Sequence, residues 1–384
     1  MHHTAVVPKA GLATAVPVRT LAARLPQFPW DALAPAAATA RAHPGGIVDL
    51  SIGTPVDSVP DLIRNALASA SDAPGYPLTK GTDQLRAAAA GWLARRHGVH
   101  VDPDTVLPVI GTKELIAWLP TMLGCGPGDA VSYPELAYPT YDVGARLAGA
   151  LPVATDEPDR PGGVPVQLAW LNSPSNPTGA VLPPTRIRAL VSWARQVGTV
   201  LASDECYLDL GFDAAPTSVL HPDICGPAHD GLLAVYSLSK RSNLAGYRAG
   251  FVAGDSGLIA SLLEIRKHAG LIVPAPVQAA MTAALGDDSH AEQQHARYAS
   301  RRARLWPALE QAGWQVAHSE AGLYLWACHP GYDCWESVRV LSEIGILVAS
   351  GSFYGTAGDR YVRAALTATD ERIDAAVARL RELR

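Results

Sequence analysis

The sequence contains few charged residues and no cluster of positive charge. Asp, Glu, Lys and Arg make up 17% of the 384 residues and hydrophobic residues 48%, whereas globular proteins average about 25% charged residues. This composition excludes a long disordered or coiled-coil protein. The net charge is −5 and no run of Lys or Arg occurs, so the usual electrostatic basis for binding nucleic acid or an anionic membrane is missing. We expect small molecules and other subunits as partners.

Cysteine and long apolar segments are also scarce. The five cysteines are odd in number and show no CxxC spacing, which argues against a disulfide framework or a zinc knuckle. No apolar stretch approaches the roughly 18 residues that a membrane span needs. His290 and His295 match no zinc spacing, and we expect them at a solvated helix start. A cytoplasmic protein without a metal centre fits these observations.

The length predicts two domains, because single hydrophobic cores stop growing at roughly 250–300 residues. From about residue 105, short apolar runs alternate with segments of helical periodicity, which is typical of an α/β fold with a buried, mostly parallel sheet. Beyond about residue 288 a long Arg-rich helix leads into a smaller α+β region. We expect an N-terminal arm that contributes to the small domain (1–45), a large domain (46–287) and a small C-terminal domain (288–384).

Polar clusters follow several of the predicted strands. Ligands of open α/β sheets bind at the carboxyl ends of strands, and each cluster alone would be an ordinary turn or helix cap. Together, a helix-start anion site, a carboxylate and a lysine on one sheet edge indicate a phosphorylated cofactor that needs an amine, namely pyridoxal phosphate. The clusters are 111–114 (GTKE), 172–179 (NSPSNPTG), 203–207 (SDECY) and 237–240 (SLSK).

Pyridoxal phosphate requires a lysine for its Schiff base, and the chain offers five. Lys240 is the candidate, because Lys113 belongs to the helix-start anion site. Asp204 is placed to pair with the pyridine nitrogen, and Tyr207 and Asn176 can bond the phenolic oxygen. The remaining lysines lie in the tail, in a polar turn and in a helix: Lys9, Lys80 and Lys267.

These residues carry a family resemblance. The segment 237–250 (SLSKRSNLAGYRAG) resembles the lysine signature of the fold-type I, class I/II aminotransferases, and 176–179 (NPTG) and 204–207 (DECY) resemble two further hallmarks in the same order. The resemblance implies a pyridoxal-phosphate enzyme of fold type I. It also implies a homodimer with shared active sites, in which Lys240 is the catalytic lysine and Asp204 and Tyr207 assist it.

The resemblance also assigns phosphate-binding residues. The backbone of Thr112 and Lys113 corresponds to the part of the family site that holds the phosphate, and Ser237 and Arg248 complete it. Tyr76, in the segment 76–81 (YPLTKG), corresponds to the tyrosine that reaches the phosphate from the neighbouring subunit.

Four positions correspond to family residues that contact the cofactor ring or the substrate. Tyr138 corresponds to the aromatic residue that stacks on the pyridine, although a core aromatic is the alternative. Arg363 corresponds to the arginine that grips the substrate α-carboxylate, for which a bidentate guanidinium is suited. Gly53 and Asn176 correspond to residues beside that carboxylate.

The segments 25–31 (LPQFPWD), 51–57 (SIGTPVD) and 240–248 (KRSNLAGYR) resemble actinobacterial succinyldiaminopimelate aminotransferases, enzymes of lysine and cell-wall precursor synthesis. This resemblance implies glutamate as amino donor and N-succinyl-2-amino-6-ketopimelate as acceptor. Both carry a second carboxylate, for which Lys80 and Arg241 are candidate partners, although a solvated surface role fits either.

Several alternatives stay open. An aminotransferase of specialised metabolism acting on another amino acid, and a lyase or racemase on the same scaffold, use the same hallmarks. A ligand-sensing regulator would need a DNA-binding segment, and the roughly 45 residues before the predicted strand at 49–51 show no helix-turn-helix and no basic patch.

Overall fold

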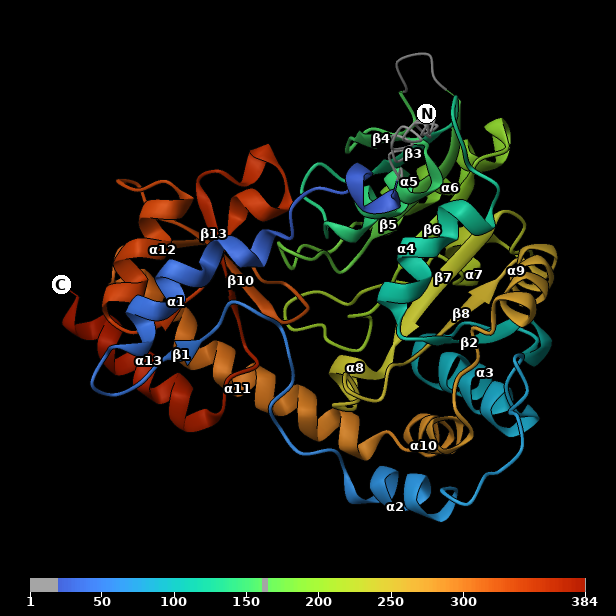
Figure 1. Cartoon of the computed structure of the whole chain (residues 1–384), viewed down its shortest axis with the longest axis horizontal. Coiled ribbons are helices and arrows are strands. Elements are labelled where there is room, and N and C mark those ends of the chain that lie inside the picture. The colour runs from blue at the N-terminus through green and yellow to red at the C-terminus, as the bar shows by residue number, and fades with distance from the viewer. Residues whose placement is uncertain (1–19, 161–164, 384) are drawn as a thin grey trace, which may run out of the picture.

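The computed structural model describes residues 20–160 and 165–383. Within these ranges seven strands form one sheet in the order β2-β8-β7-β6-β5-β3-β4 (Figure 1). Strand β8 is antiparallel to both of its neighbours, and the other neighbouring strands are parallel. The predicted α/β architecture with a mostly parallel sheet is confirmed. The strands are β2 (Val106–Ile110), β3 (Ala130–Tyr133), β4 (Leu151–Ala154), β5 (Val166–Asn172), β6 (Val200–Asp204), β7 (Leu232–Ser237) and β8 (Ala249–Gly254).

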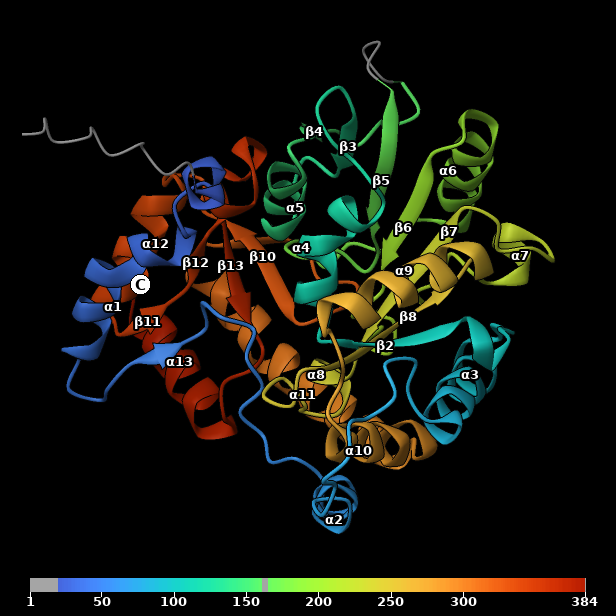
Figure 2. The same cartoon turned by 45° about the vertical axis from the view of Figure 1, so that its right-hand side comes forward.

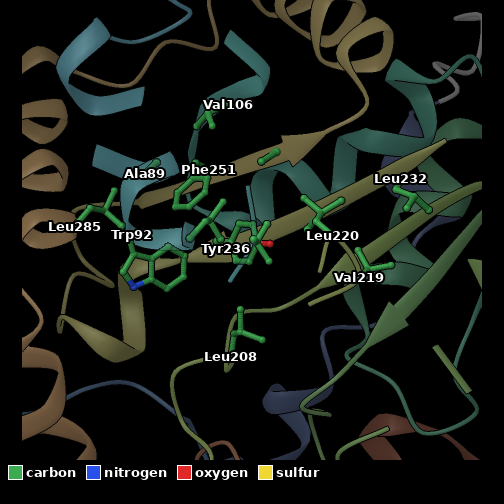
Figure 3. Packing of buried hydrophobic residues seen from close by; sticks show 14 of the residues in the cluster. Ala89, Trp92, Val106, Leu208, Val219, Leu220, Leu232, Tyr236, Phe251 and Leu285 are labelled. Atoms are coloured by element: carbon green, nitrogen blue, oxygen red, sulfur yellow. The ribbon is translucent and has the colours of Figure 1, made fainter. Parts of the chain in front are cut away.

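Helices cover both faces of this sheet. Successive side chains of each strand point to opposite faces, so each central strand contributes to two buried clusters. In β7, Leu232, Ala234 and Tyr236 belong to one buried cluster, whereas Leu233 and Val235 belong to another. Figure 3 shows part of the first cluster, where Tyr236 lies among aromatic and aliphatic side chains. The first cluster includes residues of α3 (Asp83–His97), α6 (Pro184–Val197), α7 (Pro222–Cys225) and α10 (Ala275–Gly286), and the second those of α4 (Thr112–Met122), α5 (Thr140–Ala148) and α9 (Ser256–Ala269).

A second region contains an antiparallel sheet in the order β12-β13-β10-β9, which lies beside the large sheet (Figure 2). Its core joins this sheet to the long helix α11 and to the last helix α13. The predicted α+β texture of the C-terminal part is confirmed. The elements are β9 (Gln315–His318), β10 (Tyr324–Cys328), β12 (Ala349–Ser350), β13 (Tyr361–Ala365), α11 (Ser289–Gln311), α12 (Cys334–Glu343) and α13 (Asp370–Glu382).

The N-terminal part of the described chain packs on this second region. Strand β1 (Val48–Asp49) pairs in parallel with β11 (Ile346–Leu347), and α1 (Ala34–Arg41) contacts α12. Strands β11 and β12 are neighbours in the sequence but belong to different sheets, because β11 pairs with β1 and β12 pairs with β13. The proposed domain limits stay a prediction, although this pairing places β1 beside the C-terminal segment. The remaining helices are α2 (Asp61–Ser69), α8 (Leu238–Arg241) and the 3-10 turns Leu21–Arg24, Pro29–Leu33, Pro103–Thr105, Gly351–Tyr354 and Thr356–Gly358.

The expectation of a solvated helix start at His290 is wrong. His290 is 7% exposed, and its Nε2 lies 2.8 Å from the Ser242 hydroxyl while Nδ1 lies 2.6 Å from an Asp287 carboxylate oxygen. His295 is half-buried, with Nε2 2.6 Å from the Gly211 carbonyl oxygen. His290 is buried because this end of α11 packs on α8. The described residues contain no group of three possible metal ligands and no helix long and apolar enough to cross a membrane.

Candidate active site

A cavity of about 540 Å³ lies at the carboxyl ends of the central strands. The strand register brings the polar ends of β5, β6 and β7 together, with Asn172 paired to Asp204 and Asp204 to Val235. Eleven of the twelve predicted site residues line this cavity, and Tyr76 does not, since it is fully exposed. The eleven are Gly53, Thr112, Lys113, Tyr138, Asn176, Asp204, Tyr207, Ser237, Lys240, Arg248 and Arg363.

Lys240 lies on the short helix α8, which follows β7 directly. The Ser237 hydroxyl caps this helix by accepting a hydrogen bond from the Ser239 amide at 3.1 Å. The Lys240 ammonium nitrogen donates to the Gly53 carbonyl. Burial lowers the pKa of the Lys240 amine, because a low-dielectric environment disfavours the charged form. Burial therefore shifts Lys240 toward its neutral, nucleophilic form relative to a solvated lysine.

Asp204 lies at the end of β6 and is 5% exposed. Its Oδ2 accepts a hydrogen bond from the Tyr141 hydroxyl at 2.8 Å, and its Oδ1 accepts from the Cys206 amide at 3.2 Å. Burial raises the pKa of this carboxyl, although both hydrogen bonds oppose the effect. No Lys, Arg or His forms an ion pair with Asp204 in the described part of the chain. A buried carboxylate of this kind is suited to a cationic ligand atom.

Another part of the cavity is suited to an anion. Helix α4 begins at Thr112 and has no side-chain cap, so its first amide groups are left without that partner, and Thr112 and Lys113 line the cavity. Gly111 precedes it with φ 69°, and a Cβ at this position would collide with the guanidinium of Arg248. Arg248 itself adopts a left-handed conformation with φ 56°. Glycine is favoured here because L side chains rarely adopt this φ, and its lack of a side chain lets the guanidinium lie against the backbone at the helix start.

Arg363 lies on β13 and is 2% exposed. One terminal nitrogen donates to Asn176 Oδ1 and the other to the Ser51 carbonyl, both at 2.8 Å. Two aromatic rings face the guanidinium, with Tyr324 at 3.9 Å and Tyr354 at 4.9 Å from its carbon to the ring centroids. The side chain is therefore held in one orientation on the cavity wall.

Comparison with known proteins decides the family. The family model "Aminotransferase class I and II" matches residues 46–380. The chain belongs to this family. Class I and II aminotransferases depend on pyridoxal phosphate, so the chain is a pyridoxal-phosphate-dependent aminotransferase of fold type I.

Three relatives of this aminotransferase are informative. The 4-dedimethylamino-4-oxo-anhydrotetracycline transaminase OxyQ of Streptomyces rimosus is 62% identical over 93% of this chain and 99% of its own length. The "Probable aminotransferase Rv1178" of Mycobacterium tuberculosis is 61% identical over 94% of this chain and 86% of its length. A solved structure, the "probable N-succinyldiaminopimelate aminotransferase" of Thermus thermophilus, superposes with a TM-score of 0.83 at 30% identity, covering 93% of this chain and all of that one.

The cavity of the aminotransferase fits pyridoxal phosphate on three independent counts. The buried Asp204 carboxylate lacks a cationic partner among the described residues and matches a protonated pyridine nitrogen. The uncapped start of α4 with Arg248 matches a phosphate. The Lys240 amine lines the same cavity and matches the aldehyde.

Sequence reasoning missed several residues that line the cavity. Tyr324 was hidden because it lies in a strand, where a buried tyrosine is indistinguishable from a core residue. Its hydroxyl lies 3.0 Å from the Tyr207 hydroxyl. Phe28 and Trp30 come from the N-terminal arm, and only their place in the 25–31 segment could have indicated them. Cys206, whose thiol donates to the Thr112 hydroxyl at 3.3 Å, lies beside Asp204.

The structure replaces the residues proposed from the sequence to bind the second carboxylate of the substrate. Arg241 is buried and paired with Asp209, so the expectation that it lines the substrate pocket or lies solvated is wrong. Lys80 lies 4.0 Å from Asp83 and does not line the cavity of this chain. Lys113 does line it, exposed at the rim.

Proposed function

We propose that Lys240 carries the cofactor and moves the proton of the reaction. Pyridoxal phosphate supplies an electron sink for the substrate Cα. With the cofactor bound, Lys240 would hold it and, once freed by the substrate amine, would take the Cα proton; burial shifts its amine toward the unprotonated form that this role requires. Asp204 would keep the pyridine nitrogen protonated, and Tyr207 and Asn176 would bond the phenolic oxygen.

The phosphate and carboxylate roles belong to the same proposal. The amides of Thr112 and Lys113 together with Ser237 and Arg248 bind the phosphate, and Tyr138 covers the ring. At the other end Arg363 grips the substrate α-carboxylate, since Asn176 and Ser51 fix its guanidinium. Gly53 leaves room beside it for the substrate backbone.

We infer that the enzyme transfers the amino group of glutamate to a keto acceptor that carries an anionic group far from the reacting carbon. Lys113 is the observation that supports this. Its ammonium lies 5.5 Å from the Phe28 ring centroid and 5.9 Å from that of Tyr138, at the cavity rim. Among the described residues it forms no ion pair. Partial burial and the charge of Arg248 lower the pKa of Lys113, as expected for a cation that lacks a counter-ion.

The acceptor we favour is N-succinyl-2-amino-6-ketopimelate, as a step of lysine and diaminopimelate synthesis. Its remote carboxylates match Lys113, and the T. thermophilus neighbour is named a probable N-succinyldiaminopimelate aminotransferase. A second acceptor class is a polycyclic ketone of specialised metabolism. The 62% identity to the S. rimosus transaminase and the aromatic rim made by Phe28 and Trp30 favour it.

Half-reactions of the loaded enzyme separate these possibilities. Loss of the visible absorption of the bound cofactor is followed with a panel of amino acids, and its recovery with keto acceptors. Rapid conversion by glutamate and recovery with N-succinyl-2-amino-6-ketopimelate would support the favoured acceptor. Recovery of the absorption only with a polycyclic ketone would identify the second acceptor class as the substrate. Reactivity confined to aromatic or small neutral amino acids would refute glutamate as donor.

Lys113 variants test the charge at the rim. Lys113→Met keeps the length of the side chain without its charge, so it should raise KM for glutamate about tenfold and leave KM for alanine unchanged. Lys113→Arg should retain most of the glutamate affinity. Lys267→Met on the exposed face of α9 is the matched control. An equal effect of Lys113→Met on both amino acids would contradict a role in side-chain recognition.

We also propose a homodimer that shares its active sites. Exposed apolar side chains gather on the segment that carries Tyr76, including Ile52, Val56 and Leu78, which are about half exposed. Within one chain Tyr76 is fully exposed, which fits a residue that acts in a neighbouring subunit. Mixed dimers of Tyr76→Phe and Lys240→Ala chains should regain one active site. Absence of any complementation would count against sharing.

A further inference from the structure

Tyr324 contacts three residues of the proposed site, although no role is predicted for it from the sequence. It lies at the start of β10, 3% exposed, on the cavity wall. Its hydroxyl lies 3.0 Å from that of Tyr207, and the Arg363 guanidinium carbon lies 3.9 Å from its ring centroid. It also packs on Gly53, where an added Cβ would collide with the Tyr324 hydroxyl. Gly53 in turn accepts the hydrogen bond of Lys240.

The direction of the Tyr207–Tyr324 hydrogen bond is fixed once Tyr207 has a second partner. A tyrosine hydroxyl has one hydrogen to donate and can also accept. The proposed function has Tyr207 donate this hydrogen to the phenolic oxygen of the cofactor, so Tyr324 must donate to Tyr207. A hydroxyl that accepts a hydrogen bond becomes a stronger donor.

We propose that Tyr324 is a positioning residue, which donates to Tyr207 so that Tyr207 donates to the phenolic oxygen of the cofactor, and whose ring face holds Arg363. One side chain thus couples the electronic state of the cofactor to the arginine that receives the substrate carboxylate. This inference rests on the proposed roles of Tyr207 and Arg363.

Tyr324→Phe removes the hydroxyl and keeps the ring. The negative phenolic oxygen stabilises a proton on the nitrogen that links Lys240 to the cofactor. A hydrogen bond from Tyr207 weakens that stabilisation and lowers the pKa of this nitrogen. Tyr324→Phe should therefore raise the pKa, read from a pH titration of the visible absorption of the loaded enzyme.

The expected shift is a few tenths of a pH unit. Loss of a hydrogen bond to a charged oxygen corresponds to about one to two pH units, and a cooperative partner contributes about 10–30% of such a bond. Tyr207→Phe is the reference and should shift the titration further in the same direction. Tyr354→Phe is the matched control, because its ring also faces Arg363 and its hydroxyl has no partner among the described residues. The control should titrate as the unmodified enzyme does.

A second measurement tests the contact between the Tyr324 ring and the Arg363 guanidinium. Binding of 2-oxoglutarate, the keto acid of glutamate, is measured by its effect on the same absorption. Tyr324→Phe should keep the dissociation constant within about twofold, whereas Tyr324→Leu should raise it about 5- to 30-fold, because the cation–π contact is lost. Thermal melts of both variants report whether they fold.

The outcomes separate this inference from the proposed function. If Tyr207→Phe does not shift the titration, the proposed role of Tyr207 fails. If Tyr207→Phe shifts it but Tyr324→Phe titrates as the unmodified enzyme, only the role of Tyr324 fails. An equal shift in Tyr354→Phe, or loss of cofactor binding in Tyr324→Phe while Tyr207→Phe retains it, would also overturn the inference, because the hydroxyl is proposed to act through Tyr207.

Discussion

The buried ion pair behind the catalytic lysine should make a large contribution to stability. Arg241 ends helix α8, next to Lys240, and its guanidinium Nε donates to Asp209 in the loop after β6. The two side chains are 4% and 7% exposed. His97 Nε2 lies 2.9 Å from the other carboxylate oxygen, and the ring of Trp92 lies 5.3 Å from the Arg241 guanidinium carbon. Asp209→Asn would remove the charge and leave Arg241 buried without an anion.

The magnitude follows from the cost of an uncompensated buried charge. Breaking such a pair from one side destabilises a protein by about 3–5 kcal/mol. Unfolding entropy of about 2.1 cal/mol/K per residue converts this to a fall in melting temperature of about 4–6 °C for a chain of this length. Although burial acts in the opposite direction, His97 and Arg241 hold the pKa of Asp209 well below its usual range. The stabilisation is therefore complete above about pH 4, the unfolded value, and is lost as the pH falls below it.

The assay is a thermal melt of both proteins at pH 7 and at pH 4 or below, at one protein concentration and scan rate. Asp213→Asn is the matched control, because its carboxylate pairs with Arg302 but is 57% exposed, and such surface pairs contribute at most about 1 kcal/mol. Asp209→Asn should lose several degrees at pH 7 and the control about one. A melting temperature of Asp209→Asn within one degree of the unmodified protein would refute the reasoning.

Three further predictions concern the site and its supports. Asp204→Ala should keep the circular dichroism spectrum and lose about a hundredfold or more of kcat, and near-normal turnover would refute the pyridine-nitrogen role. Burial raises the pKa of Glu205 to about 7, so its buried carboxyl destabilises the fold progressively as the pH rises from about 4.5 through 7. Glu205→Gln should therefore flatten the fall in melting temperature between pH 5 and 8, and an unchanged slope would argue against this role of Glu205. Gly111→Ala should raise the dissociation constant for pyridoxal phosphate at least tenfold through its contact with Arg248, whereas Gly124→Ala, equally left-handed but free of neighbours within 4 Å, should leave it unchanged.

The sheet and its polar edge could be predicted because the signals are local. Buried strands such as β6 and β7 are short apolar runs, and the residues that follow them must share an edge when the strands are parallel. Asp204 and Lys240 were therefore placed correctly in one cavity from sequence.

Contacts between distant segments could not be predicted. The pairing of β1 with β11 joins residues almost 300 positions apart, and nothing local marks the point where the chain leaves β11 for β12. Tyr324 reads as a core residue until β10 is placed beside Tyr207. His290 reads as solvated because Ser242 and the start of α11, which carries His290, meet only in the folded chain.

The most direct measurement is borohydride reduction of the enzyme loaded with pyridoxal phosphate, followed by peptide mass mapping. Reduction fixes the cofactor to the lysine that forms its Schiff base. We predict the cofactor mass on the peptide that contains Lys240 and its absence in Lys240→Ala. Cofactor mass on Lys113, the other lysine that lines the cavity, or on any lysine besides Lys240, would contradict the assignment on which the active site is built.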